Sequence, residues 1–183
     1  MSDKNVACKD MILELQDMTY LDWVAIMPGT PGCFAKVYEE ARGKRVYYKL
    51  SNYDHERGIF GYECVNELIV SRLMDVLGIP HADYKLIHAK VRIGGKEQET
   101  WLSVSEDFRG ANQEKLPYED YYNLEKEGNE TPLEFAIRNG WELPIYQMFC
   151  IDYLVANRDR HGGNLEVIWN KENDSVQMAP LFD

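Results

Sequence analysis

Apolar residues recur with two different periods along this chain, alternating in the first half and following three- and four-residue steps later. Alternating or β-branched runs bounded by Gly, Pro and Asn are typical of strands. They predict strands over 19–26, 33–40, 44–51, 83–93 and 99–105. The second and third of these form a predicted hairpin. We interpret residues 1–18 as an amphipathic segment and 51–61 as a polar connection.

One helix stands out in this first part, from Glu63 to Leu77. Its apolar residues fall at helical spacing, and Gly78 and Pro80 end it. Beyond residue 105 the helical period predominates. It predicts helices over 118–128, 131–140 and 143–157, followed by two strands around the turn 170–175. The polar composition between Arg109 and Gly128 favours a mobile connection.

The change of period near residues 105–109 predicts an α+β fold of two lobes with a cleft between them. The first lobe, 1–105, is expected to be β-rich with one main helix. The second, 106–183, is expected to be a partial helical lobe. A chain of 183 residues is long enough to bury a substantial core.

The charge balance narrows the range of functions that this chain can have. With 20 Lys and Arg against 31 Asp and Glu the net charge is −11, whereas a nucleic-acid-binding surface is normally basic. We find no apolar run long enough for a membrane span and no signal-peptide pattern. Widely spaced cysteines without a CxxC pair favour reduced thiols in a cytoplasmic protein: Cys8, Cys33, Cys64 and Cys150.

The most informative stretch, 157–164, lies between an apolar helix and a strand and reads NRDRHGGN. Asp159 and Asn164 have the spacing of the catalytic Asp and metal-binding Asn of protein kinases. Asp183 follows the last predicted strand, and a hairpin would return it beside Asn164, where two oxygen ligands suit Mg²⁺. Taken alone, the stretch is more readily explained as a turn, because Asp, Asn and Gly are common in turns.

A second set of candidates lies in the first half. Lys49 falls in an aromatic strand, and Glu67 falls midway along the predicted helix. In kinases a strand Lys reaches the nucleotide phosphates and is held by a helix Glu. The alternative is that both side chains face solvent.

Upstream, a Gly-rich loop offers backbone N–H groups to phosphates, with candidate residues Gly29, Thr30, Gly32 and Lys36. This loop matches neither the Walker pattern nor GxGxxG.

The order of these features is the stronger signal, since it is the order that phosphoryl transfer uses. The segments RDRHGGN and APLFD, preceded by YYKLS and GYECVNELIVSRLMDVLGIP, resemble the HipA-like kinases, whose toxin members pair with an antitoxin. The resemblance covers residues 29–183. It implies a two-lobed protein-kinase-like fold and transfer of the ATP γ-phosphoryl group to Ser or Thr of a protein.

The resemblance also implies roles for individual residues. Asp159 is the expected base, while Asn164 and Asp183 are the expected Mg²⁺ ligands. Lys49 is expected to contact the ATP phosphates, with Glu67 as its helix partner. The adenine-binding hinge is expected at Ser105, Glu106 and Phe108.

Some members of the family autophosphorylate in the Gly-rich loop. In the corresponding loop of this sequence, Thr30 is the only residue with a hydroxyl group. The cations expected around the triphosphate are Lys36, Lys49 and either Arg158 or Arg160. His161 is interpreted as a structural residue. Asp152 lies among apolar residues, where a carboxylate is costly unless hydrogen-bonded, so we predict that it braces the backbone of the catalytic loop.

Two questions stay open at this point. Kinase chains normally continue past the metal-binding Asp, so this chain is expected to be a fragment of a longer protein, or else a naturally short form. The alternatives to a protein kinase are a catalytically inactive nucleotide- or partner-binding pseudokinase and a phosphoinositide or small-molecule kinase.

Overall fold

The computed structural model describes residues 9–23, 35–41, 43–158, 160 and 164–182. Several residues singled out above lie outside this part of the chain: Gly29, Thr30, Gly32, Asp159, His161 and Asp183. The chain separates into two compact units. Unit 1 comprises Met1–Leu73 with Asp83–Asp107, and unit 2 comprises Met74–Ala82 with Phe108–Asp183.

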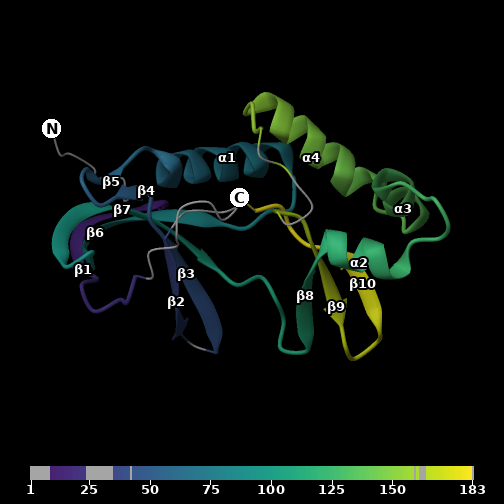
Figure 1. The fold of residues 1–183 in the computed structure, drawn as a ribbon, viewed down its shortest axis with the longest axis horizontal. Coiled ribbons are helices and arrows are strands. Elements are labelled where there is room, and N and C mark those ends of the chain that lie inside the picture. Colours follow the sequence, from purple (N-terminus) through teal and green to yellow (C-terminus); the bar gives the residue numbers. More distant parts are fainter. Residues whose placement is uncertain (1–8, 24–34, 42, 159, 161–163, 183) are drawn as a thin grey trace, which may run out of the picture. The chain divides into compact units, whose positions relative to one another are not determined.

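Unit 1 is built on a five-stranded sheet in the order β1-β6-β7-β3-β2 (Figure 1). Its strands are β1 (Met11–Asp17), β2 (Lys36–Ala41), β3 (Lys44–Lys49), β6 (Tyr84–Ile93) and β7 (Lys96–Glu106). All neighbours are antiparallel except β1 and β6, which pair in parallel. A separate small hairpin is formed by β4 (Asn52–Asp54) and β5 (Gly58–Phe60).

The helix α1 spans Glu63–Leu77, which are the limits that the sequence predicts. Its residues up to Leu73 belong to unit 1 and lie along the sheet (Figure 1). Gly78 ends the helix with φ of 66°, a conformation that favours glycine. The Ile79 N–H then donates to the Met74 carbonyl (3.0 Å), so the last turn closes on its own backbone.

The core of unit 1 lies on the sheet and includes the segment that follows β1. At the end of β6 buried and exposed side chains alternate, since Val91 and Ile93 are buried while Arg92 is exposed. The buried cluster consists of Met18, Leu21, Trp23, Ala35, Leu50, Ala89, Val91, Ile93 and Leu102.

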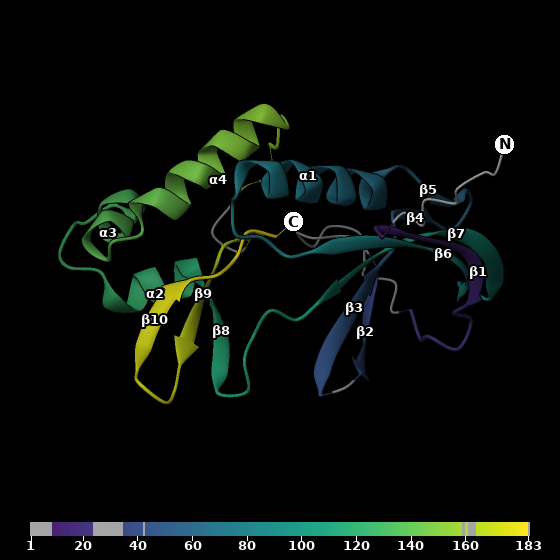
Figure 2. The same cartoon turned by 180° about the vertical axis from the view of Figure 1, so that it is seen from behind.

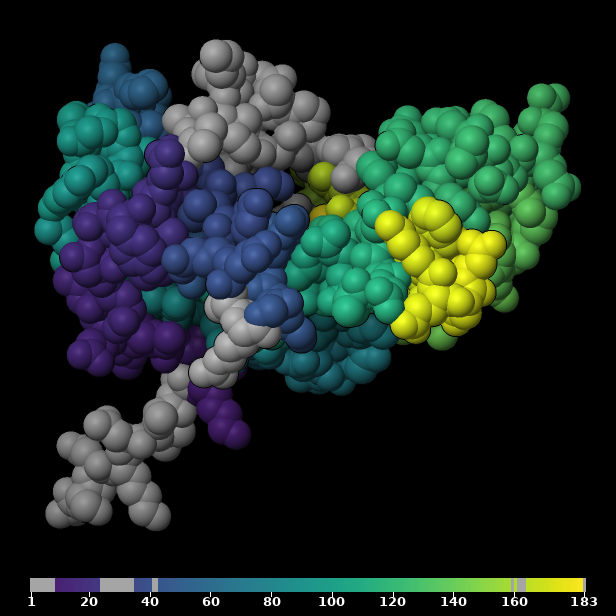
Figure 3. All heavy atoms as spheres, turned by 90° about the horizontal axis from the view of Figure 1, so that it is seen from below, coloured from purple at the N-terminus to yellow at the C-terminus, as the bar shows by residue number. Residues whose placement is uncertain are grey.

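Two predictions for unit 1 are wrong. The expected strand over 19–26 is a turn in its described part, because the Asp17 carboxylate accepts hydrogen bonds from the Thr19 N–H (3.0 Å) and hydroxyl (2.7 Å). The strand lies instead at β1, in the segment interpreted as amphipathic. The polar connection 51–61 contains the β4–β5 hairpin. On the face shown in Figure 3, the N-terminal segment (purple) lies beside the region of β2 and β3 (blue), and the Tyr20 hydroxyl donates to Glu39 on β2 (3.3 Å).

The described part of unit 2 combines a three-stranded antiparallel sheet, in the order β10-β9-β8, with helices (Figure 2). The strands are β8 (Gln113–Pro117), β9 (Glu166–Asn170) and β10 (Ser175–Met178). The helices are α2 (Tyr118–Glu125), α3 (Pro132–Arg138) and α4 (Glu142–Leu154). The helices and the β9–β10 hairpin confirm the predictions, whereas β8 lies in the stretch expected to be a mobile connection.

Aromatic packing and a capped helix start hold the helices of unit 2. The Phe135 ring lies edge-on to the rings of Tyr118 (6.0 Å) and Trp141 (6.0 Å between centroids). Thr131 and Glu134 form a reciprocal capping box at the start of α3. Because α3 is short, this cap and the buried Phe135 supply much of what keeps it helical.

Candidate active site

The central feature of unit 1 is an ion pair between the last residue of β3 and the middle of α1. Lys49 Nζ lies 2.7 Å from Glu67 Oε1, and the side chains are only 13% and 17% exposed. The expected pairing is therefore present, and the solvent-facing alternative is wrong for both residues. The Lys49 ammonium also lies 5.5 Å from the centre of the Tyr84 ring, a cation–π distance.

The first turn of α1 is tied to the backbone at the end of β3. The Cys64 N–H donates to the Ser51 hydroxyl (3.3 Å), and the Cys64 thiol donates to the Lys49 carbonyl (3.3 Å). Burial raises the pKa of Cys64, which keeps the thiol protonated and able to donate. These bonds hold the helix beside the strand independently of the Lys49–Glu67 ion pair.

Sheet register places three polar residues in one row across β2, β3 and β7. Lys36 lies opposite Lys49, and Lys49 lies opposite Ser103. Directly opposed residues of antiparallel strands face the same side of the sheet, so all three share the side on which Lys49 meets Glu67. Ser103 is 1% exposed, and its hydroxyl donates to Glu67 Oε2. The Glu67 carboxylate is thus held on both oxygens.

The expected hinge residues are divided between the two units. Ser105 is buried on β7, and exposed Glu106 pairs with Lys44 (3.7 Å). Phe108 begins the second stretch of unit 2, where its ring lies 6.1 Å from that of Phe182 and 5.2 Å from the Lys115 ammonium.

In unit 2, Arg160 joins α4 to the two chain segments that carry the predicted metal ligands. Its Nε and Nη2 donate to the two carboxylate oxygens of Asp152 on α4, each at 3.0 Å. Its Nη1 donates to the backbone carbonyls of Asn164 (2.9 Å) and Phe182 (3.4 Å). The side chains of Arg160 and Asp152 are 14% and 11% exposed, so the pair is largely shielded from water.

This arrangement refines the expectation that Asp152 braces the loop backbone directly. Asp152 holds the loop through the side chains of Arg160 and Asn157 (2.9 Å), and Arg160 in turn holds the loop backbone. Arg160 therefore has a structural role in holding the loop, and its expected role beside a triphosphate stays a prediction. Arg158 is exposed.

The hairpin expected to return the chain toward Asn164 is present. β9 and β10 pair in register from Ser175 with Asn170 to Met178 with Val167, and the Ala179 N–H donates to the Glu166 carbonyl (3.0 Å). The common Arg160 donor brings the backbones of Asn164 and Phe182 together. Among the described residues no group of three His, Cys, Asp or Glu side chains is clustered as a metal site.

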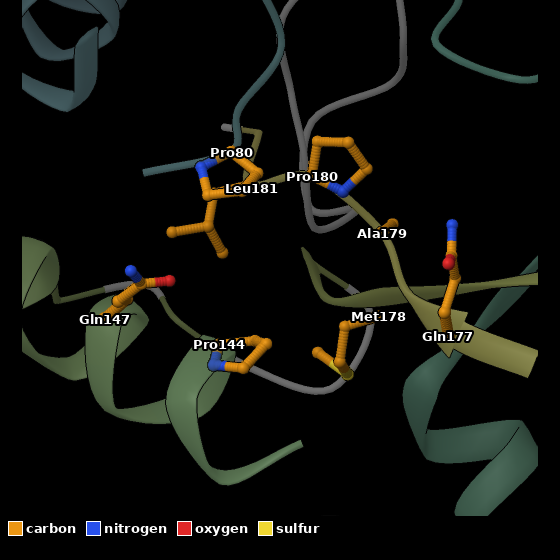
Figure 4. A pocket seen from close by; sticks show the side chains of 8 residues that line it. All are labelled: Pro80, Pro144, Gln147, Gln177, Met178, Ala179, Pro180 and Leu181. Carbon is orange, nitrogen blue, oxygen red and sulfur yellow. The ribbon is translucent and has the colours of Figure 1, made fainter. Parts of the chain in front are cut away.

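A small pocket of about 260 Å³ lies in unit 2 close to the end of the chain (Figure 4). It is lined by Pro80, Pro144, Gln147, Gln177, Met178, Ala179, Pro180 and Leu181. These proline, aliphatic, thioether and amide side chains provide no cation for a phosphate. Within the described part of the chain, no helix is both long and apolar enough to cross a membrane.

Three features of this site were not foreseen from the sequence: the contact of Ser103 with Glu67, the coupling by Arg160, and buried Asp107. The Asp107 carboxylate accepts a hydrogen bond from the Tyr47 hydroxyl (3.3 Å), and its N–H donates to the Arg45 carbonyl (2.8 Å). A signal for Ser103 existed, because Ser103 and Ser105 alternate with Leu102 and Val104 and so mark a polar face on a buried strand.

Comparison with known proteins defines the class of fold. The chain has a mixed α+β, kinase-like fold, and it matches the crystal structure of the Helicobacter pylori proinflammatory kinase CtkA with a TM-score of 0.61 at 18% identity. The match covers 92% of this chain and 57% of the other.

A sequence comparison also finds a protein named CtkA. The serine/threonine-protein kinase CtkA of Helicobacter pylori (strain J99) is 29% identical over 124 residues, covering 56% of this chain. The aligned region spans only 38% of that protein's length. No family model matches the chain.

Proposed function

We propose that this chain is the nucleotide-binding and catalytic-loop part of an ATP- and Mg²⁺-dependent serine/threonine protein kinase of the HipA-like group. The observation that carries the proposal is the shielded Lys49–Glu67 ion pair between a sheet strand and the helix on that sheet. The kinase-like fold and the name of the CtkA relative support it.

The residues fit the chemistry of a nucleotide with its metal ion. A lysine ammonium is a compact charge suited to phosphate oxygens. An Asn amide and an Asp carboxylate supply the hard oxygen ligands that Mg²⁺ prefers, and these are the proposed roles of Asn164 and Asp183. When bound, ATP with Mg²⁺ supplies the γ-phosphoryl group and neutralises the charge that develops during its transfer.

The proposed work of the protein is mainly positioning. Glu67 holds the Lys49 ammonium at one place, and Lys49 orients the phosphates. Arg160, anchored by Asp152, keeps the backbone of Asn164 and of the residue before Asp183 at a set separation. Asp159 accepts the proton of the substrate hydroxyl.

Further parts of the proposal concern the nucleotide and its surroundings. Ser105, Glu106 and Phe108 contact the adenine, and the loop with Gly29, Thr30 and Gly32 covers the phosphates. Lys36, the cross-strand neighbour of Lys49, adds a second positive charge. The whole protein phosphorylates Ser or Thr of a protein in the cytoplasm and pairs with an antitoxin.

The test is a phosphotransfer assay with γ-labelled ATP on the full-length protein. Wild type is expected to label itself or an added protein, and Asp159→Ala to abolish the label. Asp120→Ala, an exposed acid on α2, is the matched control and should retain it. Mass spectrometry then locates the phosphate, with Thr30 as the expected autophosphorylation site.

Other outcomes replace the proposal with a specific alternative. Binding of ATP without transfer to any acceptor identifies a pseudokinase, and label found only in lipid or small molecules identifies another acceptor class. An Asp159→Ala variant as active as wild type contradicts the assignment of the base.

A further inference from the structure

The Glu67 carboxylate contacts side chains from two neighbouring strands, β3 and β7. Its Oε1 lies 2.7 Å from Lys49 Nζ on β3, and its Oε2 accepts a hydrogen bond from the Ser103 hydroxyl on β7. Lys49 and Ser103 are directly opposite each other in the β3–β7 register. The two strands therefore present an ammonium and a hydroxyl, side by side, to the two oxygens of one carboxylate.

A hydroxyl at this position has a physical explanation. Ser103 is 1% exposed, and a buried hydroxyl is costly unless it is hydrogen-bonded. The neighbouring Leu102 is fully buried in the core cluster, and strand alternation turns Ser103 to the other side of the sheet, toward Glu67. A short side chain there also leaves room for the longer glutamate to reach the strand.

The second hydrogen bond restricts a flexible pair. Lysine and glutamate both have several rotatable bonds, and a single contact between them leaves the carboxylate free to turn about its last bond. Holding both oxygens fixes the carboxylate plane and, through it, the position of the Lys49 ammonium. Positioning of this kind is what a phosphoryl-transfer site requires.

We propose that Ser103 is a positioning residue for nucleotide phosphates, which fixes Glu67 so that Lys49 is held in its phosphate-binding position. This inference rests on the proposed kinase function and adds a third member to the Lys49–Glu67 pair. Without the Ser103 hydroxyl α1 keeps two contacts with the end of β3, from Cys64 to the Ser51 hydroxyl and to the Lys49 carbonyl. Ser103 also contacts the Cys64 thiol, so the experiment separates loss of that contact from loss of the Glu67 contact.

The experiment measures binding of ATP·Mg²⁺ and of adenosine to the full-length protein by calorimetry. The Ser103→Ala variant lacks one hydrogen bond to a charged group. Its Kd for ATP is therefore expected to be roughly tenfold higher than that of wild type. Adenosine, which lacks phosphates, should bind Ser103→Ala as it binds wild type. Ser103→Thr keeps the hydroxyl and should restore ATP binding to within about threefold of wild type.

Two controls separate positioning from general loosening. Tyr118→Phe removes another buried hydroxyl, which donates to the Pro132 carbonyl in unit 2 (2.5 Å), and should leave the ATP affinity unchanged. In a Glu67→Gln background, Ser103→Ala should cost much less ATP affinity than in wild type, because the two residues act as a unit.

The results also distinguish this inference from the proposed function. A wild-type protein that binds no ATP overturns the kinase proposal, and the role of Ser103 with it. A wild type that binds ATP while Ser103→Ala binds it equally well overturns only the role of Ser103. Equal weakening of ATP and adenosine also overturns it, since that pattern indicates a loosened fold.

Discussion

The guanidinium of Arg160 binds both carboxylate oxygens of Asp152, with Nε and Nη2 each 3.0 Å from its acceptor. Bidentate geometry of this kind is the strong form of an ion pair. Because Arg160 also donates to the carbonyls of Asn164 and Phe182, this pair connects a helix to the segments just before and just after the β9–β10 hairpin.

Replacing Asp152 is expected to destabilise unit 2. Asp152→Ala leaves the Arg160 charge largely buried without its partner, which should lower the free energy of unfolding by about 3 kcal/mol. Urea unfolding followed by circular dichroism measures this change. The exposed Asp120→Ala should stay within about 0.5 kcal/mol of wild type. An Asp152→Ala variant with wild-type stability would falsify the bracing role.

Lys49 is expected to control stabilisation by nucleotide. ATP·Mg²⁺ at a hundred times its Kd should stabilise wild type by about 2.7 kcal/mol, and a Lys49→Met variant under the same conditions by less than about 0.5 kcal/mol. Thermal unfolding with and without ATP·Mg²⁺ measures both values. Lys85→Met, which removes an exposed lysine of β6, is the matched control. Equal thermal shifts in the two variants contradict a phosphate-binding role for Lys49.

Gly58 and Gly43 allow a test of local packing in unit 1. Both have positive φ, 77° and 79°, but a Cβ at Gly58 would collide with the Gln98 amide whereas one at Gly43 meets nothing within 4 Å. Gln98 accepts a hydrogen bond from the Ile59 N–H (3.1 Å), which would be lost if its side chain moved.

Gly43→Ala is therefore expected to cost about 1 kcal/mol for the backbone conformation alone. Gly58→Ala is expected to cost about 2 kcal/mol, because the lost hydrogen bond adds to the same backbone term. Comparison of the two variants by chemical denaturation decides the point. Equal losses at both positions are incompatible with a packing role for Gln98.

Acid is expected to weaken unit 2 at Glu130. Hydrogen bonds from Arg138 (2.9 and 3.0 Å) hold the pKa of Glu130 below its ordinary value of 4.5. A folded-state pKa below the unfolded value gives stability that is present above about pH 4.5 and is lost as the pH falls through the lowered pKa.

The stability difference between wild type and Glu130→Gln should therefore be largest near pH 7 and should shrink toward pH 3. Denaturation curves at several pH values measure it. A difference that stays constant across this range shows that the Glu130–Arg138 contact contributes nothing through ionisation.

Local elements of the fold follow from local sequence. The limits of α1 were predictable because its helical apolar spacing ends at Gly78, whose positive φ closes the last turn. The β2–β3, β6–β7 and β9–β10 hairpins were predictable because short turns join neighbouring strands. Strands β1 and β8 were not, because β1 pairs with a strand some 70 positions away along the chain and β8 with a strand that follows three helices.

The candidate site likewise contains residues that the sequence predicts and contacts that only the structure shows. Lys49 and Glu67 were predictable because a charge in an aromatic strand and an acid 18 residues later on an amphipathic helix form a recognisable order. The sequence alone thus determined the α+β class, the main helix and the candidate chemistry. Only the tertiary structure decided that Ser103 completes the Lys49–Glu67 pair and that Asp152 neutralises Arg160. Those contacts depend on strand register and on packing between distant segments, which residue identity and local periodicity do not specify.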